Sequence, residues 1–260
     1  MSIRTDHQLP DLKYLAIVPA FNEGESIAQV CNHLLRALPQ FDVVVIDDGS
    51  SDETARLVPP QARVVSLPFN SGIGAAMQTG YRFAAVNGYD VAVQVDGDGQ
   101  HRPAEVVRLV QHLLANNLDL VVGSRFLERK SYRQTIVRQF GAWVLKKMLW
   151  ILSGGLETTD CTSGFRAASR RTIEAFAHWY PEDYPEPEVI LLLHRAGFRT
   201  GELGVKMRRR KGGSSSIGLI SGLFYVFKVG VCLLLDTIRK PWPPCRLPGA
   251  TVAPTHETHW

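Results

Sequence analysis

The chain has 260 residues, of which 45% are hydrophobic, and its formal net charge is only +4. This length and apolar content suffice for one substantial core, and so mild a charge argues against a nucleic-acid partner. The four cysteines lie far apart with no C-x-x-C spacing, which argues against a zinc site or a disulfide framework and favours a reducing compartment.

Residues 1–13 are polar and contain no apolar stretch of the kind found in secretory signals. We therefore expect a flexible N-terminus and ordered structure from Tyr14 onward. From there to about Val122, short β-branched runs alternate with amphipathic stretches, which predicts βαβ units around a mostly parallel, Rossmann-like sheet flanked by helices. The expected strands are 14–18, 42–47, 63–67, 89–95 and 118–123, and the expected helices are 27–38, 74–86 and 103–115.

The composition changes after Arg125. Lysines and arginines between residues 129 and 147 accompany an apolar helical stretch that contains Trp143 and Trp150. Basic residues beside tryptophans are typical of a membrane interface or of a site for an anionic ligand.

A second apolar run, 217–235, carries Lys228 as its one charge and approaches the ~20 residues that a spanning helix requires. We expect it to lie in the membrane interface as an amphipathic helix. The predicted organisation is a catalytic domain over 14–212, an apolar and basic membrane-associating segment over 213–240 and a disordered tail over 241–260.

Polar and acidic side chains follow three of the expected strands. The first strand ends in Pro-Ala-Phe-Asn-Glu (19–23), the second in Asp-Asp-Gly-Ser-Ser-Asp (47–52) and the fourth in Asp-Gly-Asp-Gly-Gln-His (96–101). A single acidic strand end is as readily a helix cap as a functional group. Ligands of open parallel sheets bind beyond the carboxyl ends of the strands, so three such ends at one edge indicate a site.

The third of these clusters has the chemistry of a cation site. Asp96 and Asp98 flank a glycine, and Gln100 adds an amide oxygen. These are the hard oxygen ligands that Mg²⁺ or Mn²⁺ prefers, and such an ion neutralises a diphosphate leaving group. The alternative interpretation is that Asp96 and Asp98 are two turn aspartates that bind no ligand.

The order of the three motifs strongly resembles that of the family-2 glycosyltransferases, and most of all their dolichol-phosphate mannose synthase and polyprenyl-phosphate glycosyltransferase branch. The resemblance covers about residues 14 to 235. It implies the GT-A nucleotide-diphospho-sugar transferase fold with a C-terminal membrane-interface helix. Further matches are Asn70-x-Gly72-x-Gly74-Ala75-Ala76, Gly123-Ser124-Arg125, Asp160-x-x-Ser163-Gly164-Phe165-Arg166 and Arg210-x-x-Gly213-x-Ser215.

The resemblance also implies a role for each matched position. The positions implied for the nucleotide are Pro19, Ala20, Asn22, Glu23, Asp48, Asn70, Gly72, Asp96 and Gly97. The positions implied for the metal are Asp96, Asp98 and Gln100. Those implied for the acceptor or the diphosphate are Ser124, Arg125, Arg138, Arg210 and Ser215. Forked arginine donors suit a phosphate, although a solvated basic face would also place arginines here.

The implied reaction is inverting transfer of a hexose from a UDP-, GDP- or dTDP-sugar to a polyprenyl phosphate. A phosphate acceptor is already anionic, whereas a sugar hydroxyl needs a carboxylate base. Glu186 and Glu188, just before a helix expected near Val189, are the candidate bases and join Asp98 as predicted catalytic residues. Both also suit the N-terminal end of a helix dipole. Transfer to a saccharide hydroxyl of a cell-wall or surface polysaccharide therefore stays open.

Other classes fit the sequence less well. A sugar-phosphate nucleotidyltransferase needs a glycine-rich, lysine-bearing signature where Asn22 and Glu23 stand, and a dinucleotide site at 72–77 has Met77 where a small residue belongs. A non-catalytic membrane scaffold is the remaining alternative. We expect the protein at the cytoplasmic face of a membrane, peripheral or held by a single segment, and the sequence allows a homo-oligomer without specifying one.

Overall fold

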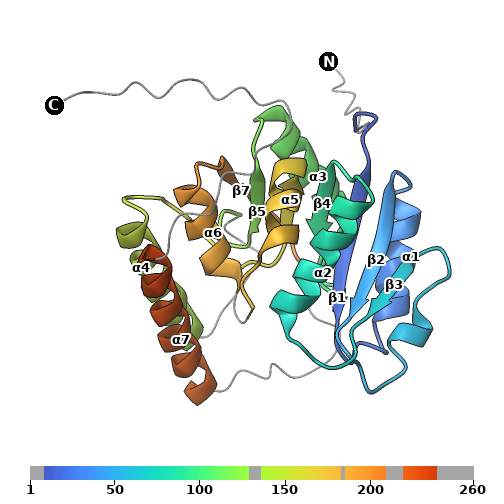
Figure 1. Ribbon diagram of the computed structural model, residues 1–260, viewed down its shortest axis with the longest axis horizontal. Coiled ribbons are helices and arrows are strands. Elements are labelled where there is room, and N and C mark those ends of the chain that lie inside the picture. Colours follow the sequence, from blue (N-terminus) through green and yellow to red (C-terminus); the bar gives the residue numbers. More distant parts are fainter. Residues whose placement is uncertain (1–8, 129–135, 183–184, 209–218, 239–260) are drawn as a thin grey trace.

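The computed structural model describes residues 9–128, 136–182, 185–208 and 219–238 (Figure 1). The strands are β1 (Tyr14–Ala20), β2 (Phe41–Asp47), β3 (Arg63–Ser66), β4 (Val91–Gln94), β5 (Leu120–Ser124), β6 (Arg166–Ser169) and β7 (Thr200–Gly204). The helices are α1 (Ile27–Ala37), α2 (Ile73–Val86), α3 (Pro103–Ala115), α4 (Ile136–Leu152), α5 (Arg170–His178), α6 (Pro185–Arg195) and α7 (Leu219–Ile238), with a short 3₁₀ turn at Ala55–Leu57. Each strand and helix expected between residues 14 and 124 has its counterpart here.

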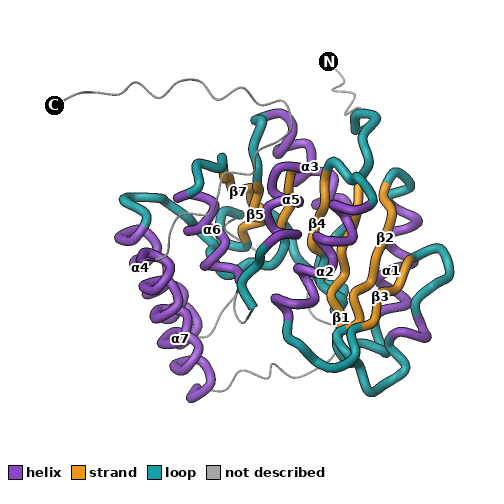
Figure 2. The backbone as a smooth tube through the Cα atoms, viewed as in Figure 1, coloured by secondary structure: helices purple, strands orange, loops and turns teal. Residues whose placement is uncertain are grey.

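One seven-stranded sheet, in the order β3-β2-β1-β4-β6-β5-β7, runs through these residues (Figure 2). β1 pairs in parallel with β2 and with β4, and β7 pairs in parallel with β5. The exception is β6, which lies antiparallel between β4 and β5. The sheet is therefore mostly parallel, as predicted, although the sequence patterns did not reveal β6 or β7.

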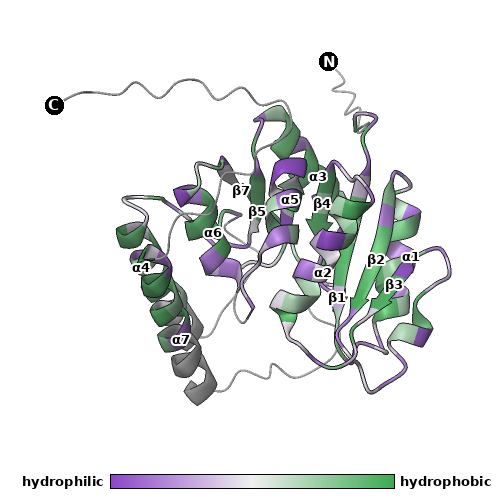
Figure 3. Ribbon diagram, viewed as in Figure 1, coloured by the Kyte–Doolittle hydropathy of each residue, from purple (hydrophilic) through white to green (hydrophobic). Residues whose placement is uncertain are grey.

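The sheet is apolar on both faces because helices cover both (Figure 3). Alternate residues of β1 point to opposite sides, so Leu15 and Ile17 belong to one core cluster and Ala16 and Val18 to the other. The first cluster packs under α2, α5 and α6, and the second under α1 and α3. This three-layer arrangement fixes the strand ends on which the site is built.

α4 and α7 lie side by side at one end of the molecule (Figure 1). A Cβ added to Gly230 would lie 3.2 Å from the Met148 methyl group, so the absence of a side chain there allows this close packing. The predicted C-terminal helix is present, displaced by two or three residues at each end. Among the described residues, no helix combines the length and the hydropathy needed to cross a membrane.

Candidate active site

The carboxyl ends of β1, β2 and β4 meet at one edge of the sheet because these strands are parallel neighbours. The Asn22 side-chain oxygen accepts the backbone N–H of Ser51 at 2.9 Å, which joins the first two strand ends. The Ser26 hydroxyl donates to the Gly97 carbonyl at 2.8 Å and to the Glu23 carboxylate at 2.7 Å, which joins the first and the fourth. The three motifs thus lie together at one edge of the sheet, as their places after parallel strands predict.

The chain entering α2 is joined to the end of β2. Asp48 is buried, and its carboxylate accepts the backbone N–H groups of Ser71 at 2.7 Å and Gly72 at 2.9 Å. Gly72 has φ +90°, a backbone conformation that glycine adopts without strain. Asn70 is exposed beside it and accepts from the same Gly72 N–H at 3.2 Å. The residues predicted for the nucleotide therefore gather around the ends of β1 and β2.

A Cβ at Gly97 would lie 3.3 Å from the Pro19 carbonyl oxygen, so the fourth strand end runs close against the first. The Ala20 carbonyl accepts the backbone N–H of Asp48 at 2.9 Å. Pro19 and Ala20 therefore contribute backbone atoms to this region, where β1 contacts the ends of both β2 and β4.

Asp96, Asp98 and Gln100 occupy the loop after β4. Both oxygens of Asp98 accept from Gln100, from its backbone N–H at 3.0 Å and from its side-chain amide. Asp96 is about two fifths exposed (41%) and lies on the wall of a cavity that Gln100 also lines. Among the described residues, no cluster of three or more His, Cys, Asp or Glu side chains is arranged as a metal site. Two carboxylates and an amide nevertheless present the oxygen donors that Mg²⁺ and Mn²⁺ accept.

His101 contacts both the backbone and the side chain of Asp96. Its Nδ1 accepts the backbone N–H of Asp96 at 3.0 Å, its Nε2 lies 3.6 Å from the Asp96 carboxylate, and its ring stacks on Phe165 with centroids 4.3 Å apart. Burial lowers the pKa of His101, against the opposing effect of Asp96 and Asp98. Because Nδ1 accepts a backbone N–H, the proton of the ring is on Nε2, which faces Asp96. The sequence motif contains His101, but its role was not predicted.

A cavity of about 200 Å³ opens beside Asp96. It lies between the loop after β4, the segment that precedes β6 and the first turn of α6. A Cβ at Gly164 would lie 2.8 Å from the side-chain nitrogen of Gln94, so glycine allows this segment to lie close against β4. The lining residues are Ile73, Gln94, Asp96, Gln100, His101, Arg125, Thr162, Ser163, Gly164, Glu186 and Met207.

Of the two candidate bases, Glu186 is on the cavity wall and Glu188 is buried away from it, outside the lining. Burial raises the pKa of the Glu186 carboxyl, the guanidinium of Arg166 opposes the shift, and Asp96 adds to it. Arg166 is itself buried and donates to the Glu186 carbonyl at 2.7 Å, which holds the first turn of α6 in place. The position suits Glu186 for a contact with an acceptor or a sugar.

The residues predicted for the acceptor fall in different places. Arg125 lines the cavity and forms a two-pronged ion pair with Asp160 at 2.7 Å. Ser124 is fully buried behind that wall, with its hydroxyl 2.6 Å from that of Thr159. Arg138 belongs to α4, and its side chain lies outside the described part of the chain, as do Arg210 and Ser215 altogether.

Several residues of this wall were not predicted individually. Gln94, Thr162 and Met207 line the cavity, and Glu202 of β7 contacts the segment behind it. Gln94 and Glu202 are polar residues inside strands, which is a weak sign of a site at the sheet. Met207 carries no such sign because apolar residues are common next to a strand.

The family model of glycosyl transferase family 2 matches residues 15–176. An undecaprenyl-phosphate mannosyltransferase of Micrococcus luteus is 33% identical over 171 residues, which are 63% of this chain and 69% of the relative. A polyprenol monophosphomannose synthase of Mycolicibacterium smegmatis is 33% identical over 175 residues, 64% of either chain.

A solved structure of glucosyl-3-phosphoglycerate synthase from Mycobacterium tuberculosis, in complex with Mn²⁺, UDP and phosphoglyceric acid, has the same fold. Its TM-score is 0.66 at 22% identity, over 87% of this chain and 78% of that one. The predicted α/β fold of the GT-A type is thereby confirmed.

Proposed function

Because this chain belongs to glycosyl transferase family 2, we propose that it transfers a hexose from a nucleoside-diphosphate sugar to a polyprenyl phosphate at a membrane surface. The single observation that carries this proposal is the cavity in which Asp96 and Gln100 face Arg125, Thr162 and Ser163. One wall suits a cation and a diphosphate, and the other carries the guanidinium of Arg125, whose positive charge suits an anion. Two relatives are named for transfer to lipid phosphates, which supports the same acceptor class here.

The donor binds in the crevice at the ends of β1, β2 and β4. Asn22, Glu23 and Asp48 meet the base and ribose there, and Asn70 and Gly72 shape the pocket, with Pro19, Ala20 and Gly97 as its backbone walls. Carboxylate and amide groups can satisfy the edges of a base and the ribose diol. The base of the donor is uracil, guanine or thymine.

Asp96, Asp98 and Gln100 would hold Mg²⁺ or Mn²⁺, which would neutralise the diphosphate as it leaves. The fit rests on their oxygen chemistry, on the exposure of Asp96 and on the support that His101 gives it. The neighbouring structure with Mn²⁺ and UDP supports a divalent cation without identifying which.

Attack by an acceptor phosphate oxygen on the face of the sugar opposite the nucleotide would invert the anomeric centre and release the nucleoside diphosphate. Arg125 neutralises and orients the acceptor, and Ser163 and Thr162 line its approach. An anionic acceptor needs no base. Glu186 would then contact the sugar or exclude water instead of removing a proton.

The second candidate function is transfer to a saccharide hydroxyl. Its specific support is the place of Glu186 on the cavity wall, where burial raises the pKa of this carboxyl and makes it a better base. Lipid-phosphate transfer is preferred because the relatives named above use that class of acceptor.

The α4–α7 apolar face supports the membrane location. We define this face by Trp143, Trp150, Ile151, Phe227, Leu234 and Ile238, all well exposed, with Phe227 at 70% and Ile238 at 82%. Lys147 lies 4.7 Å from the Trp150 ring and adds a positive charge. A tryptophan-bearing apolar face beside a lysine suits an anionic lipid surface. The proposed nucleotide-sugar donor supports the cytoplasmic side for that surface.

A transfer assay tests the proposal. Purified protein with Mn²⁺ is mixed with radiolabelled UDP-glucose, GDP-mannose or dTDP-rhamnose, and with undecaprenyl phosphate or a soluble oligosaccharide. The proposal predicts label in the organic phase with undecaprenyl phosphate and one of these donors. Label that enters only the oligosaccharide would favour the second candidate function instead.

A further inference from the structure

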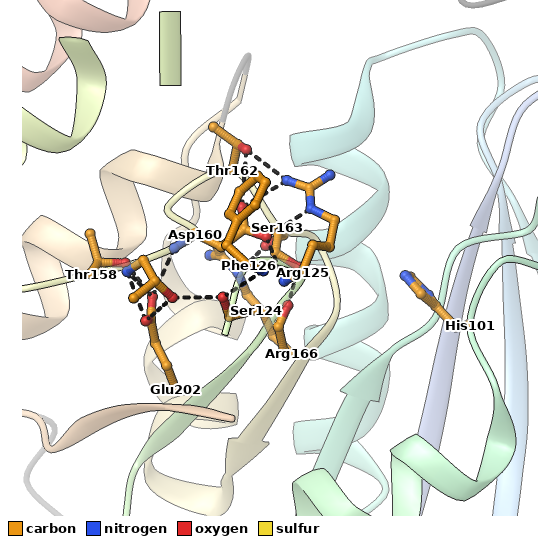
Figure 4. A network of polar contacts seen from close by, with 12 residues as sticks. His101, Ser124, Arg125, Phe126, Thr158, Asp160, Thr162, Ser163, Arg166 and Glu202 are labelled. Atoms are coloured by element: carbon orange, nitrogen blue, oxygen red, sulfur yellow. Dashed lines mark hydrogen bonds and ion pairs between the residues drawn. The ribbon is translucent and has the colours of Figure 1, made fainter. Parts of the chain in front are cut away.

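The carboxylate of Glu202, on β7, is wrapped by the segment 158–160 (Figure 4). Its oxygens accept the backbone N–H groups of Thr159 at 2.8 Å and of Asp160 at 3.1 Å. The hydroxyls of Thr158 and Thr159 donate to the same carboxylate, the latter at 2.6 Å. One charged group thus receives donors from three consecutive residues, and hydrogen bonds to charged acceptors are the stronger kind.

Segment 158–160 lies between α4 and β6, in a stretch with neither helix nor strand. Its conformation therefore depends on contacts with the rest of the fold. Glu202 provides such contacts from the sheet itself, because β7 is paired with β5 and Glu202 is the register partner of Val122. The carboxylate ties an irregular segment to a rigid element.

Asp160 connects segment 158–160 to the cavity wall. Its side chain is 1% exposed and accepts from Arg125 three times, from Nε and Nη2 at 2.7 Å and from the backbone N–H at 3.0 Å. Nη2 of Arg125 also donates to the Thr162 hydroxyl at 2.8 Å. Arg125 and Thr162 both line the cavity, so contacts that begin at Glu202 end at its surface.

We propose that Glu202 is a positioning residue for the acceptor. It holds segment 158–160 so that Asp160 fixes the guanidinium of Arg125 in the orientation that receives the acceptor phosphate. This inference rests on the proposed function, since it takes the acceptor to be a phosphate. A planar guanidinium recognises phosphate in a narrow range of orientations, so disorder of the segment weakens acceptor binding and spares the nucleotide crevice.

Two variants probe the contact. Glu202→Gln keeps the size of the side chain but turns an NH₂ group toward backbone donors. Thr158→Val removes one hydroxyl donor with little change of shape, and it decides the question if Glu202→Gln does not fold. The matched control is Glu174→Gln on α5, where the glutamate pairs with Arg170 at the surface.

Steady-state kinetics with undecaprenyl phosphate give the first readout. Glu202→Gln should raise the KM for this acceptor roughly tenfold and Thr158→Val roughly threefold, with kcat changed less than about twofold, because ground-state binding is what is lost. The Kd of UDP with Mn²⁺, measured by calorimetry, should stay the same. A purely structural role would lower the Tm without this split between KM and kcat. An unchanged acceptor KM in folded Glu202→Gln and in Thr158→Val overturns the proposal.

A second readout does not require activity. The Nε–H proton of Arg125, assigned in NMR spectra with the Arg125→Lys variant, should exchange with solvent roughly tenfold faster in Glu202→Gln than in the wild type or the control. If the wild type transfers no sugar to a lipid phosphate yet shows this difference, the proposed function fails and the positioning role stands. Equal exchange in the wild type and both variants overturns the positioning role whatever the activity.

Discussion

The regions proposed for the nucleotide and for the acceptor, here called the nucleotide side and the acceptor side, are built in different ways. The nucleotide side, at the ends of β1, β2 and β4, consists of short motifs that each follow a strand directly. The acceptor side brings together β5, the segment before β6, the first turn of α6 and β7, and its contacts link residues about 35 to 44 positions apart. The first side is made mainly of contacts between side chains and backbone groups, and the second adds an ion pair and hydrogen bonds among side chains.

Because the two sides differ, substitutions in them should have different effects on activity. A change in the nucleotide side should remove activity with every acceptor, because the donor and the cation bind there. A change in the acceptor side should alter the choice of acceptor or the stability of the cavity wall while leaving nucleotide binding intact.

The largest expected effect comes from Asp98. Asp98→Asn should lower kcat about a thousandfold with any acceptor, because a charged ligand to the cation is lost where the diphosphate leaves. The exposed Asp11→Asn serves as the control. EDTA should abolish the activity of the wild type. Added Mn²⁺ should restore the activity of the wild type but not that of the variant. An Asp98→Asn enzyme that keeps a tenth of the wild-type rate contradicts the metal assignment.

Glu186→Gln separates the two candidate acceptors. If a saccharide hydroxyl is the acceptor, loss of the base should slow transfer about a hundredfold or more. With a polyprenyl phosphate, the rate should change no more than about threefold, because no proton has to be removed. Glu188→Gln is the comparison variant. If the transfer rate fell in Glu188→Gln but not in Glu186→Gln, the role given to Glu186 at the cavity would be contradicted.

Arg125→Ala should cost about 3 kcal/mol of unfolding free energy, because it leaves the Asp160 carboxylate buried without its cation. Urea denaturation measures this loss. The double variant Arg125→Ala with Asp160→Asn should recover part of it, since the uncompensated charge is then removed. Equal losses in the single and double variants would show that the ion pair does not hold this wall.

The smallest effects concern the α4–α7 apolar face. Trp143→Ser and Phe227→Ser should each weaken binding to anionic vesicles about fivefold, because each removes roughly 1 kcal/mol of apolar burial in the lipid interface. Transfer to a short-chain, water-soluble polyprenyl phosphate should be unaffected. Val86→Ser, on the exposed end of α2, is the control. Unchanged sedimentation of both variants with vesicles would place the membrane contact elsewhere.

The arrangement of the strand ends on the nucleotide side could be predicted from the sequence because strands and motifs are local. The β-branched runs gave β1 to β5 nearly at their observed bounds, and parallel topology then brings Asn22, Asp48 and Asp96 to one edge. Buried strands and amphipathic helices have strong periodic signals, and the acidic ends stand out against them.

The acceptor side could not be predicted to the same extent. β6 is a short strand that lies antiparallel between β4 and β5, and no local sequence pattern predicts that placement. The pairing of Asp160 with Arg125 and the contacts of Glu202 depend on tertiary structure. The family resemblance proposed Arg125 for the acceptor, but the sequence could not show that a buried carboxylate pairs with it, and it could not choose between Glu186 and Glu188.

Diffraction at the manganese absorption edge, from crystals grown with Mn²⁺ and UDP, GDP or dTDP, tests the central claim most directly. The account predicts one anomalous peak within coordination distance of the Asp96, Asp98 and Gln100 side chains and of a diphosphate, with the nucleoside at the ends of β1 and β2. A nucleotide bound elsewhere, or one bound at these strand ends with no manganese beside Asp96, would contradict it.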